Sequence, residues 1–196
     1  MNPPADSRST LLACALHLFA RHGYDAVGVQ QIVAAAGLTK PSLYHHFGSK
    51  LGLLETLLDD RLAPFHARLA SAADVHADLC GNLGATLAAI ARTSFEVVAA
   101  EPDVYRLYLS LWFAPPESEA YRAALPWHER HFAAIEAVFL AAAEHHGNMA
   151  GRHRAYAATF LGTFNTYASF GLNGVATLDE ALLDRAIHQF MHGIFS

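Results

Sequence analysis

The sequence predicts an all-α protein built from about nine helices. No stretch shows the strict alternation of apolar and polar residues that half-buried β-strands require. Apolar residues recur instead at spacings of three and four along most of the chain, as they do on the buried face of a helix. With 53% hydrophobic and 16% charged residues, the composition is that of a well-packed globular protein.

The first helix is expected to begin after a cap at Ser7 or Ser9 and to end at about His22, because Gly23 follows. One stripe of this helix is apolar and would form one wall of a small N-terminal core. That stripe consists of Leu12, Ala15, Leu16 and Phe19.

Residues 30–50, QQIVAAAGLTKPSLYHHFGSK, predict two short helices joined by a tight turn. Gly37 allows the positive φ that ends the first of them, and Thr39 is suited to cap the second. Leu43 and Phe47 share one face of the second helix at a spacing of four and would pack on the core. The opposite face carries hydrogen-bond donors and flat rings of the kind that contact nucleic acid, namely Lys40, Ser42, Tyr44, His45 and His46. The pattern is that of a helix-turn-helix whose second helix faces outward.

The rest of the chain predicts six further helices separated by glycines and prolines. Ser49 would cap the first of them; Pro64 is expected to kink or end it, and Pro126 to interrupt a later one. Residues 177–180, Thr-Leu-Asp-Glu, form a capping box that would open the last helix. The expected ranges are 50 to about 64, 76–100, 103–113, 117–146, 152–172 and 178–195. We expect a domain boundary between residues 1–49 and residues 50–196, crossed by a helix.

Residues 13–50 closely resemble the N-terminal DNA-binding domain of TetR-type bacterial transcriptional regulators. The resemblance rests on the string AAGLTK, followed by LYHHF and by Ser49-Lys50. Val27 and Gly28 stand where that family often has Thr and Ser, and Leu51-Gly52 replaces a usual acidic pair. The resemblance implies a C-terminal helical domain, from residue 50 to residue 196, that binds a ligand and dimerises.

The resemblance also implies which residues contact DNA. They are Thr39, Lys40, Pro41, Ser42, Tyr44, His45 and Lys50, with Lys50 holding a phosphate. The charge distribution agrees with such a role. The formal net charge is −5, but residues 1–50 carry four basic and two acidic side chains, and the excess of acid lies in the remainder. A mildly basic N-terminal segment, residues 1–50, which we call the head, followed by an acidic remainder is typical of a protein that contacts DNA at one end.

A ligand pocket is expected in the C-terminal domain, because aromatic residues are concentrated on the helices that the family uses for its effector. The candidates are Phe95, Tyr108, Trp112, Phe113, Trp127, His131, Phe164 and Asn165. The composition favours an apolar or aromatic ligand of moderate size. Plain core packing is the alternative for each aromatic side chain taken singly.

The last two helices carry apolar residues on more than one face, which predicts a homodimer formed through a four-helix bundle. The residues assigned to this interface are Tyr156, Phe160, Ile187, Phe190, Met191 and Ile194. The alternative is that these helices close the core of a single chain. A dimer would present two heads about 34 Å apart, or a multiple of that distance, to a palindromic operator.

The predicted function is that of a ligand-responsive transcriptional regulator, most simply a repressor released from DNA by its effector. The alternative is an architectural DNA-binding protein without an effector.

No catalytic motif such as Gly-x-Ser-x-Gly, HExxH or a Walker loop is present, so the chain is not expected to be an enzyme. Neither His128 and His131 nor His188 and His192 have a third ligand at a metal-binding spacing, so no metal or cofactor is expected. The absence of a signal peptide and of an uninterrupted apolar run of eighteen residues predicts a cytoplasmic protein.

Overall fold

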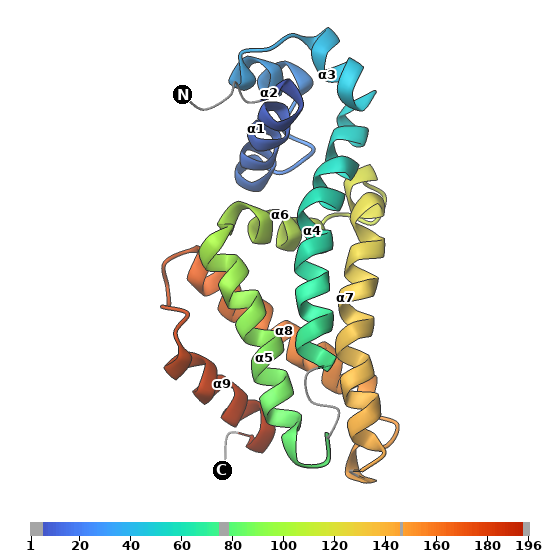
Figure 1. Ribbon diagram of the computed structural model, residues 1–196, viewed down its shortest axis with the longest axis vertical. Helices are drawn as coiled ribbons and strands as arrows, with labels where there is room; N and C mark the ends of the chain where they lie inside the picture. Colours follow the sequence, from blue (N-terminus) through green and yellow to red (C-terminus); the bar gives the residue numbers. More distant parts are fainter. Residues whose placement is uncertain (1–5, 75–78, 146, 194–196) are drawn as a thin grey trace. The chain divides into compact units, whose positions relative to one another are not determined.

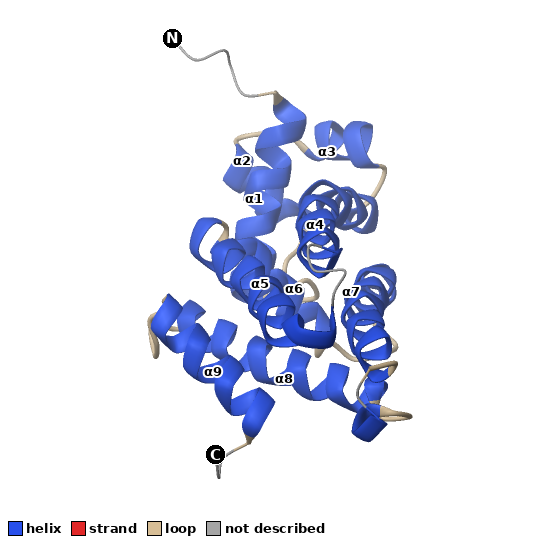
Figure 2. Ribbon diagram, turned by 60° about the horizontal axis from the view of Figure 1, so that its bottom comes forward, coloured by secondary structure: helices blue, strands red, loops and turns tan. Residues whose placement is uncertain are grey.

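The structure, a computed structural model, describes residues 6–74, 79–145 and 147–193 (Figure 1). In this part of the chain it contains nine α-helices, one short 3-10 helix and no β-strand (Figure 2). The predicted all-α class is therefore confirmed. The helices are α1 (Ser7–His22), α2 (Val29–Ala36), α3 (Lys40–Phe47), α4 (Lys50–Asp74), α5 (Leu79–Ala100), α6 (Pro102–Trp112), α7 (Glu119–Ala143), α8 (His153–Leu172) and α9 (Glu180–His192), with the 3-10 turn at Gly147–Met149.

The chain divides into two compact units. Unit 1 comprises Met1–Ala63 and Asp103–Pro126, and unit 2 comprises Pro64–Pro102 and Trp127–Ser196. This division differs from the expected boundary after residue 49, because α6 and the start of α7 belong with the N-terminal helices. The division into a DNA-binding segment 1–49 and a ligand-binding segment 50–196 concerns function and stays a prediction.

Helices α1, α2 and α3 pack around one small core in unit 1. The side chains at its centre are fully buried: Leu11, Ala15, Phe19, Ile32 and Leu43. The cap of α1 is neither Ser7 nor Ser9, as was expected, but Asp6, whose carboxylate accepts a hydrogen bond from the backbone N–H of Arg8. Asp6 prevails because its charge suits the positive end of the helix.

The turn between α2 and α3 has the predicted geometry. Gly37 has φ of 64° and ψ of 27°, the left-handed conformation, and the next N–H, of Leu38, donates to the carbonyl of Val33 at 2.9 Å. Thr39 occupies the N-cap position of α3, although its hydroxyl makes no capping hydrogen bond. Gly37 thus turns the chain with no side-chain cost and sets the direction of α3.

The junction between α3 and α4 explains one departure from the family pattern. Ser49 caps α4 as predicted, since its Oγ accepts a hydrogen bond from the N–H of Gly52 at 2.9 Å. A Cβ atom on Gly52 would lie 2.2 Å from the carbonyl oxygen of Phe47. Real Cβ atoms do not approach backbone oxygen so closely, so this tight junction requires glycine at position 52.

Pro64 does not end its helix, which was one of the two outcomes predicted for it, and Pro126 does not interrupt its helix, contrary to the prediction. Both lie inside continuous helices, α4 and α7. A proline inside a helix costs about 3 kcal/mol. Around Pro64, Leu62 and Phe65 are only 2–3% exposed, and burying each such side chain contributes about 1.5–3 kcal/mol. Burial on both sides of the proline therefore offsets its cost.

In unit 2, helix α5 packs against both α8 and α9. The cap of α9 is Asp179, which accepts from the N–H of Leu182 at 2.8 Å, in place of the predicted capping box beginning at Thr177. Gly193 ends α9 after His192, and the expected continuation to Phe195 falls outside the described residues. Residues 83–100 of α5 are long and apolar enough to cross a membrane by length and composition, but 56% of this stretch is buried within the protein, as in the core helix of a soluble fold.

Candidate functional site

Helix α3 buries one face and exposes the other, as the sequence predicts. Leu43 and Phe47 point into the core and are at most 9% exposed. Tyr44 is 48% exposed although it is large and partly apolar, and His45 beside it is also exposed. Of the other residues assigned to DNA contact, Thr39, Lys40 and Pro41 are exposed, and Ser42 is half-buried. The helix therefore presents a row of donors and rings on its exposed side.

Lys50 is placed differently from the other predicted DNA contacts. Its ammonium group donates to the carbonyl oxygens of Tyr24 at 3.0 Å and Val27 at 3.1 Å. The same nitrogen lies 3.9 Å from the centre of the Tyr24 ring, in a cation–π contact. Lys50 thus ties the start of α4 to the loop between α1 and α2, and its predicted contact with a phosphate would compete with these bonds.

Replacing Lys50 with Met is expected to destabilise the protein by about 1.5–3 kcal/mol, because two charge-assisted hydrogen bonds are lost while the apolar stem is kept. The same change at Lys40, the exposed lysine of α3, is expected to stay within about 0.5 kcal/mol. Urea unfolding followed by circular dichroism compares the two variants with the parent protein. Equal stability of the two variants would show that the Lys50 bonds do not hold the head together.

Tyr24 connects this loop to the rest of unit 1. Its ring packs on Phe19 with centroids 5.1 Å apart, and its hydroxyl donates to the carboxylate of Glu119 at the start of α7. Burial and the adjacent carboxylate raise the pKa of Tyr24 well above its usual range, so the hydroxyl stays protonated. A second link joins His17 of α1 to Asp103 of α6, with 2.9 Å between Nδ1 and Oδ2. These two contacts explain why α6 and the start of α7 belong to the N-terminal unit.

The residues predicted to line a ligand pocket are divided between the two units. Tyr108 and Trp112 pack on each other in α6, in unit 1, with ring centroids 6.1 Å apart. Phe113, directly after α6, is 78% exposed. In unit 2, Phe95 packs on Phe164 with centroids 6.2 Å apart. Trp127 and His131 belong to a separate group of rings, and Asn165 is 8% exposed in α8.

That separate group of rings centres on His66 of α4. The His66 ring lies 5.3 Å from Trp127 and 5.6 Å from His131, measured between centroids. Burial lowers the pKa of His66 to about 4 and that of His131 to about 3. Basic neighbours lower both values further: Arg130 and His128 act on His66, and His66 and His128 act on His131. Both imidazoles are therefore neutral at pH 7.

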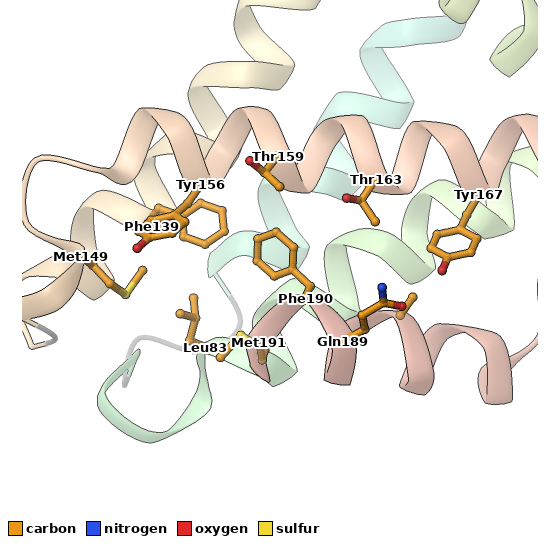
Figure 3. Close-up of a pocket in the computed structure, with 11 residues that line it drawn as sticks. Leu83, Phe139, Met149, Tyr156, Thr159, Thr163, Tyr167, Gln189, Phe190 and Met191 are labelled. Carbon is orange, nitrogen blue, oxygen red and sulfur yellow. The ribbon is translucent and has the colours of Figure 1, made fainter. Parts of the chain in front are cut away.

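A groove of about 540 Å³ lies elsewhere in unit 2, between α8 and α9 (Figure 3). From α8, Tyr156, Thr159, Thr163 and Tyr167 point into it, and Gln189 and Phe190 enter from α9 (Figure 3). It is completed by Leu83, Phe139, Met149, Ala186 and Met191. None of the eight predicted pocket residues lines this groove. The missed signal was a stripe of hydroxyl-bearing residues on α8, spaced by three and four.

Three of the residues that line the groove were assigned from the sequence to a dimer interface: Tyr156, Phe190 and Met191. Met191 is 39% exposed although it is apolar. Phe160 is only 1% exposed and contacts the rings of Phe164 and Phe190, so it belongs to the core of its own chain. Ile187 is also buried, and Ile194 lies outside the described residues. The alternative explanation, closure of the single-chain core, therefore holds for Phe160.

The comparison with known families concerns the N-terminal helices and the start of α4. Residues 11–57 match the bacterial regulatory proteins of the tetR family. This segment is TetR-like. The chain is 35% identical over 117 residues to the HTH-type transcriptional repressor KstR2 of Rhodococcus jostii, a match that covers 54% of this chain and 53% of that protein. It is 43% identical over 56 residues to the HTH-type transcriptional activator FasR of Mycolicibacterium smegmatis, which covers 29% of this chain and 26% of FasR. The chain thus spans at most about half the length of these curated relatives.

Solved structures extend the likeness of the fold to nearly the whole chain. The regulator FadR of Bacillus subtilis, solved with stearoyl-CoA, superposes with a TM-score of 0.76 at 16% identity, over 95% of this chain and 98% of FadR. AibR, solved with isovaleryl coenzyme A and operator DNA, superposes with a TM-score of 0.72 at 21% identity, over 94% of this chain and 97% of AibR. At these identities the comparison establishes the fold, including the helices beyond residue 57 that the family profile does not reach.

Proposed function

We propose that the protein is a ligand-responsive, DNA-binding transcriptional regulator, which acts as a repressor by binding a palindromic operator as a homodimer. The observation that carries this proposal is α3. Its buried side is fixed by Leu43 and Phe47, and its exposed side presents Lys40, Tyr44 and His45 within the segment that matches the family. A helix held rigidly in this way can enter the major groove and read base edges, while neighbouring donors hold phosphates.

Dimerisation is supported by the groove between α8 and α9. Apolar side chains such as Met191 and Phe190 line it, and burying them against a second copy of the same surface would remove them from water. A two-fold dimer would also supply the second α3 that recognition of a palindrome requires. The residues Tyr156, Phe190 and Met191 are assigned to this interface.

An effector is supported by the solved relatives, two of which were captured with acyl-CoA molecules. For this chain we propose an effector with an apolar or aromatic body, bound in unit 2. It needs to bind the DNA-competent and DNA-free states with different affinities. A tenfold loss of operator affinity requires only about 1.4 kcal/mol of coupling between the two sites. As a regulator of this kind, the protein would work in the cytoplasm and would catalyse no reaction.

Operator selection tests the proposal directly. The purified protein is incubated with a random pool of double-stranded DNA, and the enriched sequence is then used to measure affinity. We expect a palindrome with half-sites one helical turn apart, or a multiple of it, and at least a tenfold loss of affinity for Lys40→Ala and for Tyr44→Ala. Arg152→Ala removes one exposed positive charge outside the matched segment and serves as the control.

Two outcomes would contradict the proposal. Enrichment of no sequence even at low salt would show that the head is not a specific reader. Tight binding without sequence preference, with a steep salt dependence and equal losses in all three variants, would indicate an architectural DNA-binding protein.

A further inference from the structure

His66 is an unusual residue in the interior of unit 2. Its side chain is 94% buried, since 6% of it is exposed, yet neither ring nitrogen has a hydrogen-bond partner in the described part of the chain. Nearly all buried polar groups in proteins are hydrogen-bonded, and leaving one unsatisfied is costly. A polar ring kept at such a position needs an explanation beyond packing, because Phe or Leu would pack there at lower cost.

His66 is surrounded by aromatic rings and by basic side chains. Phe65 contacts the imidazole rings of both His66 and His131, and Trp127 contacts that of His66. In these three contacts the rings are steeply inclined to each other, with interplanar angles of 69–86°. The guanidinium of Arg130 lies over the Trp127 ring, 4.8 Å from its centre. The groups whose charges act on His66 are Arg130 and His128, and those that act on His131 are His66 and His128. All of them are basic, and they come from α4 and α7.

A metal ion does not account for this cluster. Among the residues that the structure describes, no three His, Cys, Asp or Glu side chains have the arrangement that would hold a metal. An anion would account for both the unpaired ring nitrogens and the basic neighbours, because it accepts hydrogen bonds from imidazole N–H groups and is attracted by the positive charge of Arg130. The aromatic rim suits an apolar body attached to that anion.

We propose that the His66, His128 and His131 cluster binds the acidic group of the effector, and that this effector is an organic acid with an apolar or aromatic body. The proposal rests on the function proposed above and specifies the chemistry of its ligand. It places the acid-binding site among α4 and α7 in unit 2, apart from the groove between α8 and α9, which is left for the second copy of the chain.

Proton uptake follows from the state of the cluster before binding. At pH 7 the imidazoles of His66 and His131 are neutral, because burial and their basic neighbours disfavour the charged form. A carboxylate that enters this site raises the pKa of the imidazole it contacts, so one proton from solvent accompanies each carboxylate. Affinity for the acid should therefore fall as the pH rises from 6 to 8, towards a tenfold loss per pH unit.

The test uses the full chain and two matched pairs of probes: octanoate with octanamide, and 4-phenylbutyrate with 4-phenylbutyramide. Calorimetric titration in buffers of different ionisation enthalpy measures both the affinity and the protons taken up. We expect each acid to bind at least tenfold more tightly than its amide, with uptake of up to one proton. Nitrogen-15 spectra of the imidazoles should show one buried histidine becoming charged when the acid binds.

Variants separate this role from packing. His66→Phe keeps an aromatic ring and should lose at least tenfold in affinity for the acids, while His66→Gln keeps hydrogen bonding and should lose the proton uptake. His145→Gln, at an exposed position after α7, is the control and should behave as the parent protein. Equal affinity for acid and amide, binding unchanged in His66→Phe, or no binding of either acid at millimolar concentration would each overturn the proposal.

Operator binding of the same proteins is measured in parallel. If the palindrome is bound while the acids fail to bind, the assignment of the effector as an organic acid is wrong and the regulator remains. If no operator is found while the acids bind at His66, the proposed function fails and the acid site stands.

Discussion

The protein is expected to lose several kcal/mol of stability between pH 7 and pH 4.5. The pKa values of His66 and His131 are lowered in the folded chain, to about 4 and about 3, and return to about 6.5 on unfolding. Between these values the unfolded chain binds more protons than the folded chain, so stability rises with pH and falls on acidification. Each buried histidine removes about 1.4 kcal/mol per pH unit below about 6.5, which brings the combined loss at pH 4.5 to the order of 5 kcal/mol.

Urea unfolding at pH 7 and at pH 4.5, followed by circular dichroism, measures this loss. His66→Phe removes one of the two titrating groups and should reduce the pH dependence by about half. It should also be at least as stable as the parent protein at pH 7, because it removes a buried polar ring that has no hydrogen-bond partner among the described residues. The exposed His145→Gln variant should keep the full dependence. A parent protein equally stable at both pH values would show that the two histidines are hydrated in solution.

Met191→Glu is expected to raise the dissociation constant of the proposed homodimer by about a hundredfold or more. Met191 lies on α9 and lines the groove assigned to the interface, with 39% of its side chain exposed in the single chain. Two-fold symmetry brings two such carboxylates into each dimer, where their burial is opposed by desolvation and by mutual repulsion. A hundredfold change corresponds to about 2.8 kcal/mol, well within the cost of burying unpaired charges.

Sedimentation velocity over a range of protein concentrations gives the dissociation constant, and operator affinity should fall with it. Val175→Glu makes the same change of charge at a position that is 69% exposed and does not line the groove. It should leave the dimer unchanged. A Met191→Glu protein that still dimerises like the parent would mean that another surface joins the two copies.

The head could be predicted from sequence because its signals are local. The turn at Gly37, the cap position of Thr39 and the buried pair Leu43 and Phe47 all lie within eleven residues, and each depends on its near neighbours. The exposed face of α3 followed directly from that register. Lys50 was the exception. Its ammonium group is held by carbonyl oxygens more than twenty residues away in the chain, a contact that no local pattern records.

The C-terminal residues were harder to predict because their roles depend on packing between distant segments. Tyr108 and Phe113 are both aromatic and only five positions apart, yet one is buried and the other exposed. The groove depends on which faces of α8 and α9 meet. From hydrophobicity alone, Tyr156, Phe190 and Met191 could be assigned to a dimer interface, but the groove that they line could not be predicted. Pro64 was expected to kink or end its helix and Pro126 to interrupt its helix, yet both helices continue through the proline. Local propensity does not count the tertiary burial that offsets the cost of a proline.

The contacts of Lys50 also determine how the head responds to amine-directed chemistry. The chain contains only two lysines, and both lie in the head. The amine of Lys40 is on the exposed face of α3, whereas that of Lys50 is occupied by two carbonyl groups and an aromatic ring. Of the two lysines, Lys40 should therefore react first with a mild acylating dye, which would place a reporter on the helix proposed to enter the major groove. The same reaction would neutralise one of the few positive charges there, so labelling and loss of DNA binding should proceed together.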